Sequence, residues 1–210
     1  MDLTLDLSEI DNFDFDNQCE EAFQQMACAR FLAVDTETTG LLVKDGRSTL
    51  MGISVAGRNL FNGEKMFSYY FPLRHARNNI SEANEKILRE QLLSRNKDMP
   101  VVWHNAKFDW FSLLTVGIDM TRVPFYDTMM MARLVNENFF SYKLDWLSKF
   151  VLKNEGKLKT DLWEACLRIF GWSPEFPAYV MGTYAVVDTE RTLELFEWLF
   201  PRFLSEGLNG

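Results

Sequence analysis

The sequence predicts an α/β fold in which a mixed β-sheet is flanked by helices on both faces. Two β-rich runs follow a first apolar strand, as in a meander; strand and helix patterns then alternate; and the last part carries helical patterns alone. With 210 residues, of which 47% are hydrophobic and 25% charged, the composition is that of a well-cored domain. We therefore expect one domain over residues 1–210.

The first predicted elements are a helix and three strands. Asn17 followed by Glu20 is typical of a helix N-cap with its capping-box partner, ahead of apolar residues at helical spacing. The apolar run 31–34 predicts a buried strand. The runs 50–56 and 66–71 predict two further strands, joined antiparallel through turn-forming glycines and asparagines.

Strand and helix are then expected to alternate. Apolar residues at helical spacing predict a helix from Ser81 that stops near Asn96, and a short strand follows at 101–104. The next helix should span 106–116 and end at Gly117, whose lack of a side chain suits a helix C-terminus.

Helices alone are predicted for the remainder of the chain. Asp127 is a suitable N-cap for a helix that begins at Thr128. Further helical patterns cover 142–152, 161–170 and 177–200, and we expect Pro201 to terminate the last of them.

Several classes of protein are disfavoured. No apolar run approaches the roughly 18 residues of a membrane span, and the start is acidic where a secretory signal is basic, so we expect a cytoplasmic protein. The three cysteines show no C-x-x-C spacing, and His75 and His104 are the only histidines, too few for a histidine-built metal site. Neither G-x-x-x-x-G-K-[ST] nor G-x-G-x-x-G occurs, which disfavours triphosphate and dinucleotide binding.

The sharpest motif places two carboxylates at the end of the first apolar strand. Residues i and i+2 of a strand point to one face, so Asp35 and Glu37 stand side by side. Paired carboxylates repel each other unless a cation or proton lies between them, and a hard divalent ion fits. The alternative for this pair is a solvated turn.

Two further motifs each end in an acid. In the first, a strand leads through Asn105 and Lys107 to Asp109, which lies in the first turn of a predicted helix. In the second, Tyr184 and Asp188 lie one turn apart on the last helix. Taken singly, Asp109 could be a surface helix acid and Tyr184 a core aromatic. Asp188 among buried neighbours requires a partner.

Together these motifs resemble the DEDDy 3′-5′ exonuclease family, and in particular the proofreading exonuclease domain of bacterial DNA polymerase I-type (family A) polymerases. The resemblance rests on Asp35-Thr-Glu37, Asn105-x-Lys-Phe-Asp109 and Tyr184-x-x-x-Asp188, and it spans residues 31–200. The related branch with histidine five residues before the last Asp would need it at Thr183, so Tyr184 decides the subtype.

The resemblance implies a ribonuclease-H-like fold and a site that degrades DNA from its 3′ end. Asp35, Glu37, Asp109 and Asp188 would hold two Mg²⁺ or Mn²⁺ ions, which suit all-oxygen ligands. Tyr184 would orient the attacking water, and nucleoside 5′-monophosphates would be released. The resemblance further implies that Leu41 wedges against the terminal bases and that Asn105 positions the 3′ end; Lys107 could touch a phosphate.

Substrate and partners remain expectations. Single-stranded or frayed DNA 3′ ends are the expected substrate, and a DNA polymerase in cis or in trans is a possible partner in replication and proofreading. The first alternative is a 3′-5′ exoribonuclease that trims RNA. The second is a catalytically silent nucleic-acid-binding subunit, against which the intact acids argue.

The net charge of −8 resides in an acidic leader over residues 1–21, which carries eight acids and no Lys or Arg. The other 189 residues hold 22 acids and 22 bases, and two divalent ions would make this body positive. We expect the leader to be solvated or packed on an edge, with occlusion of the groove or docking of a basic partner as alternatives. A basic stretch, 143–159, is either a solvated helix face or a DNA contact.

Overall fold

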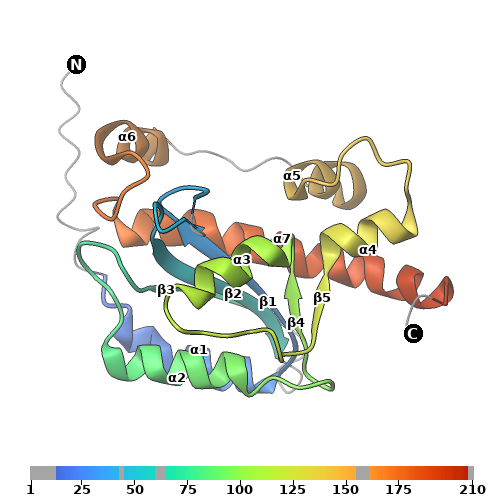
Figure 1. Cartoon of the computed structure of the whole chain (residues 1–210), viewed down its shortest axis with the longest axis horizontal. Helices are drawn as coiled ribbons and strands as arrows, with labels where there is room; N and C mark the ends of the chain where they lie inside the picture. Colours follow the sequence, from blue (N-terminus) through green and yellow to red (C-terminus); the bar gives the residue numbers. More distant parts are fainter. Residues whose placement is uncertain (1–12, 43–44, 60–64, 155–160, 208–210) are drawn as a thin grey trace.

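A computed structural model of the chain describes residues 13–42, 45–59, 65–154 and 161–207. Its centre is a five-stranded sheet of order β3-β2-β1-β4-β5 (Figure 1). Strands β1 (Ala29–Thr38), β2 (Leu50–Asn59) and β3 (Met66–Pro72) form an antiparallel meander, as predicted. On the other side of β1, β4 (Val101–Trp103) and β5 (Phe125–Asp127) continue the sheet in parallel. The mixed sheet confirms the predicted α/β fold.

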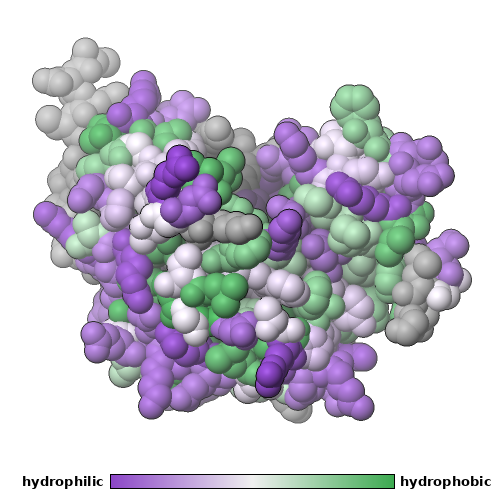
Figure 2. Space-filling model, viewed as in Figure 1, coloured by the Kyte–Doolittle hydropathy of each residue, from purple (hydrophilic) through white to green (hydrophobic). Residues whose placement is uncertain are grey.

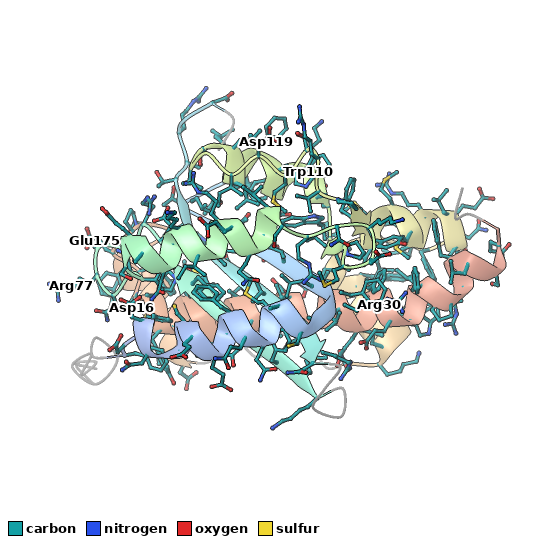
Figure 3. All side chains as sticks on the ribbon, turned by 90° about the horizontal axis from the view of Figure 1, so that it is seen from below. Asp16, Arg30, Arg77, Trp110, Asp119 and Glu175 are labelled. Atoms are coloured by element: carbon teal, nitrogen blue, oxygen red, sulfur yellow. The ribbon has the colours of Figure 1, made fainter. Side chains whose placement is uncertain are left out.

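One face of the sheet is covered by α1 (Asp16–Cys28), α2 (Glu82–Leu93) and α3 (Ala106–Leu114). Figure 3 shows α1 and α2 side by side, with Asp16 at the start of α1. The Asp16 carboxylate accepts a hydrogen bond of 2.9 Å from the backbone N–H of Ser81, the N-cap of α2, and this contact ties the two helix starts together.

The other face is covered by α4 (Thr128–Val135) and the long helix α7 (Ala178–Ser205), which crosses the sheet behind the strands in Figure 1. Two short helical segments lie over α7 at opposite ends of the molecule. They are α6 (Asp161–Phe170) and α5 (Leu144–Leu147), and α5 continues into a π-helical turn at Ser148–Leu152.

The pleat of β1 divides its side chains between the two faces. Leu32 and Val34 are buried in the cluster formed with α1, α2 and α3, whereas Ala33 is buried in the cluster formed with α4 and α7. Continued alternation points Thr36 toward the α3 face and turns Asp35 and Glu37 toward the α7 face. The strand therefore presents its two acids to a single helix.

The first predicted helix start is wrong by two residues. Helix α1 begins at Asp16 with Phe15 as its N-cap, so Asn17 lies inside the helix and makes no capping hydrogen bond. Asp14 accepts a hydrogen bond of 3.0 Å from the Asp16 N–H, and Phe15 is buried, so local bonding and packing start the helix earlier. Of the acidic leader, residues 1–12 lie outside the described residues, and the rest enters α1.

The predicted end of the last helix is also wrong. Pro201 lies inside α7, which continues to Ser205. Proline removes one helical hydrogen bond, but here the loss falls within the last two turns. Arg202 follows it and donates a side-chain hydrogen bond of 2.6 Å to the carbonyl of Trp198, and its guanidinium lies 3.7 Å from the centre of that indole.

Other boundaries differ less. The short strand β5 was not predicted, and the helix expected over 142–152 is α-helical only at Leu144–Leu147 before the π turn. Gly117 and Gly171 follow α3 and α6 with φ of 77° and 61°, the left-handed backbone expected of a helix-terminating glycine. Among the described residues, no helix combines the length and the apolar character that crossing a membrane requires.

Candidate active site

Three carboxylates meet between β1 and α7. Asp35 and Glu37 come from the α7 face of β1, and Asp188 comes from the middle of α7. Each offers a ligand oxygen, and these oxygens all lie within 4.8 Å of one another. Glu37 is buried, and the other two are half-buried. Segments more than 150 residues apart in the sequence thus build one acidic cluster.

Asp109 approaches the same region from the opposite face of the sheet. It is buried in the first turns of α3, and its Oδ1 accepts hydrogen bonds from Thr36, at 3.0 Å from the backbone N–H and 2.7 Å from the hydroxyl. Burial, followed in size by the charge of Asp35, raises the pKa of Asp109 well above its ordinary value. Asp109 therefore lies near enough to Asp35 for its pKa to respond to that charge, although Asp109 is not one of the three clustered carboxylates.

Thr36 explains how the acid from α3 reaches the strand. It alternates between Asp35 and Glu37, so it points away from them and toward α3. Its two donors fix the Asp109 carboxylate against β1, and the hydrogen bonds partly offset the cost of burying that group. This role of Thr36 was not predicted, although the strand period alone places Thr36 on the face opposite the acids.

Glu37 lies near a buried tyrosine. Glu37 pairs across the sheet with Gly52, and a Cβ on Gly52 would lie 2.3 Å from the hydroxyl of Tyr70. Burial and then the charge of Glu37 raise the pKa of Tyr70 well above its ordinary value. The Tyr70 hydroxyl lies 2.8 Å from His75 Nε2, and His75 Nδ1 lies 2.7 Å from the carbonyl of Phe176.

This contact chain has a defined direction. A carbonyl can only accept, so His75 Nδ1 carries the proton and Nε2 accepts from the Tyr70 hydroxyl. The wall beside Glu37 is thus a neutral, fully bonded pair of rings, consistent with the lowered pKa of His75, which burial causes. Both ring nitrogens of His75 therefore have hydrogen-bond partners, Tyr70 and Phe176.

Tyr184 lies one turn before Asp188 on α7, as its spacing predicts. Its half-buried ring packs on Trp163 of α6, with centroids 5.0 Å apart and planes tilted by 30°. Trp163 itself is buried. Helix α6 thereby limits the positions open to the Tyr184 ring, a contact that nothing in the sequence spacing indicated.

Asn105 occupies a special position between β4 and α3. Its φ of 71° is left-handed, a conformation that asparagine tolerates better than most residues. Asp127 accepts hydrogen bonds from the backbone N–H groups of Asn105 at 3.2 Å and of Ala106 at 2.9 Å. The Asn105 side chain is left exposed.

The remaining predicted substrate contacts lie at the surface. Leu41, just beyond β1, is 85% exposed, an unusual fraction for a large aliphatic side chain. Lys107 is exposed in the first turn of α3. Neither belongs to the acidic cluster, and both lie on segments that flank it in the chain.

The cluster has the ligand chemistry of a hard divalent cation. Its donors are carboxylate oxygens alone, a set that favours Mg²⁺ or Mn²⁺ over zinc or copper. Partial burial of three like charges is unfavourable without a counter-ion. The residues therefore fit a divalent metal, and Asp109 stands beside them as a further acid.

Comparison with known proteins agrees with this geometry. The profile of the DNA polymerase A-type 3′-5′ exonuclease family matches residues 10–203. The DNA polymerase DpoZ of Salmonella phage PMBT28 is 30% identical over 179 residues, which are 80% of this chain and 26% of that protein. The chain thus spans about a quarter of that relative's length.

Two solved structures share the fold at low sequence identity. Brucella melitensis NrnC with bound Mg²⁺ superposes with a TM-score of 0.61 and 18% identity, covering 86% of this chain and 77% of that one. Escherichia coli RNase D, an exoribonuclease involved in structured RNA processing, has a TM-score of 0.60 and 15% identity over 94% of this chain and 46% of that one.

The sheet topology and the position of the acids define a ribonuclease-H-like exonuclease fold. The match over residues 10–203 narrows the assignment: the chain belongs to the family of 3′-5′ exonuclease domains typical of A-type DNA polymerases.

Proposed function

We propose that the protein is a 3′-5′ exodeoxyribonuclease that releases nucleoside 5′-monophosphates from single-stranded or frayed DNA ends. The observation that carries the proposal is the convergence of Asp35, Glu37 and Asp188 within 4.8 Å, in a chain of the exonuclease family. DNA rather than RNA is proposed because the relative that is 30% identical is a DNA polymerase.

Asp35, Glu37 and Asp188 would hold one divalent ion, and Asp35 together with Asp109 would face a second. Bound Mg²⁺ or Mn²⁺ would lower the pKa of a coordinated water and stabilise charge on the departing 3′ oxygen. The proximity of Asp35 to both Asp188 and Asp109 supports a ligand shared between two ions.

The protein's own groups would orient the substrate around this cluster. Tyr184, which packs on Trp163, would align the attacking water by hydrogen bonding. Leu41 would pack against the terminal bases, and its high exposure leaves it available for that contact. Asn105 would bind near the 3′ end, and Lys107 would contact a phosphate.

A role beside a polymerase is proposed on the strength of the relatives. The chain corresponds to about a quarter of a phage DNA polymerase, so an exonuclease that removes misincorporated nucleotides during replication is the role that fits. The polymerase could be part of the same polypeptide or a separate protein.

The proposal is tested with matched 5′-labelled DNA and RNA oligonucleotides of one sequence, each incubated with the protein and Mg²⁺. We expect the DNA to shorten from its 3′ end one nucleotide at a time, with nucleoside 5′-monophosphate as product. Faster loss of the RNA would identify an exoribonuclease, as the named activity of RNase D illustrates for the same fold. Binding of both strands without cleavage would identify a silent binding subunit.

A further inference from the structure

An exposed aromatic surface lies on the segment that includes α5. Trp146 and Phe150 are stacked, with ring centroids 4.6 Å apart and planes at 14°. Phe139 packs against both rings, and the Phe140 ring lies 6.4 Å from Trp146. Phe140 is 90% exposed and Phe150 is 54% exposed. We call these four residues, Phe139, Phe140, Trp146 and Phe150, the aromatic platform.

Positive charge surrounds this platform. Lys143, Lys149 and Lys153 are exposed, and none of them forms an ion pair with a described residue. Lys153 places its Nζ 5.4 Å from the centre of the Phe150 ring. Figure 2 shows hydrophobic and hydrophilic residues side by side over the α5 end of the molecule.

The neighbouring acid does not cancel this charge. Asp145 lies in the same segment, but its Oδ1 accepts from Arg191 Nη1 at 3.3 Å, and Arg191 is buried on α7. Glu137 is a further exposed acid of the segment, and the three lysines outnumber it, so the surface keeps a net positive charge. Flat rings with nearby cations are the combination that binds single strands without reading sequence.

The segment that carries the platform is anchored to α7 close to Asp188. Arg191, which holds Asp145, follows Asp188 by three residues, a rise of about 4.5 Å along α7. One turn further, Glu194 accepts a hydrogen bond of 2.8 Å from Asn154, at the other end of the π turn. Two polar contacts thus anchor the α5 segment to α7 directly beyond the carboxylates.

We propose that the aromatic platform binds the nucleotides of a single strand that trail the 3′-terminal nucleotide, with bases stacked on Phe140 and Phe150 and phosphates beside the lysines. The inference rests on the proposed function and adds a second substrate contact outside the cleavage site. A nucleic acid fits better than a protein partner because the exposed rings lie among three lysines that form no ion pair with any residue the structure describes. A stretch of backbone that includes a π turn is also a common feature of functional sites.

The first experiment measures the dependence of KM on substrate length. With oligo-dT of three and of ten nucleotides and Mg²⁺, wild type should show a lower KM for the decamer. The Phe140→Ala/Phe150→Ala variant should lose this advantage, with a decamer KM raised about fivefold or more, since each stacked base contributes a factor of that order. Ile169→Ala on α6, which is 61% exposed, is the matched control and should behave as wild type.

The second experiment tests the lysines through salt dependence. The slope of log KM for dT decamer against log [KCl] should fall by about 2 in the Lys143→Gln/Lys149→Gln/Lys153→Gln variant, because each phosphate contact on a single strand contributes about 0.7. A charge-matched control, Lys65→Gln/Lys86→Gln/Lys97→Gln, changes exposed lysines just before β3, on α2 and after α2, and should keep the wild-type slope.

The outcomes separate the two proposals. If wild type cleaves both oligonucleotides and the double phenylalanine variant retains the full length advantage, the platform is not a nucleic-acid site and the inference is overturned. Unchanged KM together with lost binding to a polymerase fragment would assign the surface to a protein partner and also overturn it. If wild type cleaves neither length, the proposed function itself fails.

Discussion

At the scale of single residues, the two-residue repeat of β1 determines which acidic side chains share a face of the sheet. Asp35 and Glu37 share a face of β1, and Thr36 between them turns to the other face and binds Asp109. The pairing of the first two acids was predictable from the sequence because the strand repeat is local. The arrival of Asp188 within 4.8 Å required the whole fold, since α7 crosses the sheet more than 150 residues later.

Tyr184 is predicted to affect turnover without dismantling the acidic cluster. In Tyr184→Phe the ring can still pack on Trp163, so only the hydroxyl that would orient water is lost. We expect kcat to fall by about 100-fold, at the low end for a positioned proton-transfer group, with the Mn²⁺ concentration for half-maximal rate unchanged. Tyr179→Phe, on the same helix, is the control. A kcat equal to wild type would remove Tyr184 from the mechanism.

Gly52 is predicted to accept no side chain. A Cβ there would meet the Tyr70 hydroxyl at 2.3 Å and the Phe71 carbonyl at 2.8 Å, so Gly52→Ala must displace the strand that pairs with Glu37. We expect a loss of about 1–3 kcal/mol in the free energy of unfolding, measured by urea denaturation. Ser54→Ala changes a buried neighbour on the same face of β2 and should cost far less. Equal midpoints for Gly52→Ala and wild type would refute the close contact.

At the scale of elements, one aspartate organises two helix starts. Asp127 caps α4 through the N–H groups of Met129 and Met130, at 2.9 and 3.3 Å. The same carboxylate binds the N–H groups of Asn105 and Ala106 at the start of α3. The first role was predicted, because a helix cap is local in sequence. The second was not, since it depends on β5 lying beside β4.

Replacing Asp127 should therefore cost more than one helix cap. Asp127→Ala removes an acceptor from four backbone donors, and we expect a loss of about 2 kcal/mol or more in the free energy of unfolding. Asp119→Ala removes an acid whose hydrogen bonds to described residues stay within its own turn, so its unfolding midpoint should stay near that of wild type. If both variants unfolded at the same urea concentration, the double cap would be unimportant.

The wrong helix boundaries share a physical cause. Pro201 was predicted to end the last helix. Helix α7 nevertheless continues beyond it, because packing against the sheet and α4 holds the helix along its length. Asn17 was predicted to be the N-cap of the first helix. The helix starts earlier because Phe15 is buried and Asp16 accepts a hydrogen bond from Ser81, the N-cap of α2. Tertiary contacts overrode local preference in both places.

At the scale of the whole molecule, the half-buried His104 links stability to pH. Burial lowers the pKa of His104 to about 4, against a smaller opposing influence of the Asp127 charge. The neutral ring is therefore preferred in the folded state. Its contribution to stability is complete above the unfolded pKa of about 6.5 and is lost as the pH falls through the folded pKa.

This linkage predicts a measurable difference between wild type and His104→Asn. Between pH 7 and pH 4 the wild-type free energy of unfolding should fall by about 3 kcal/mol more than that of the variant. Asparagine is chosen because its amide can take the place of Nδ1, which lies 2.8 Å from the Thr128 hydroxyl. Urea denaturation at several pH values gives the comparison. Parallel pH profiles for the two proteins would contradict a depressed His104 pKa.

The order and type of most elements could be predicted because hydrophobic periodicity, helix caps and turn residues depend only on residues that are close together in the sequence. The α/β class and the antiparallel meander followed from these patterns. The supports of the site could not be predicted in this way. Trp163 behind Tyr184, and Tyr70 behind Glu37, are ordinary aromatics in the sequence and acquire their roles only through packing.

The most direct test of the central claim compares wild type with Asp35→Ala on a 5′-labelled single-stranded DNA over a range of Mg²⁺ concentrations. Asp35 belongs to the group of three carboxylates and also lies close to Asp109. We predict stepwise shortening from the 3′ end by wild type, saturating with Mg²⁺, and no shortening by Asp35→Ala at any concentration while its circular dichroism stays native. Equal rates for the two proteins would contradict the assignment of these carboxylates as the metal-binding centre of the exonuclease.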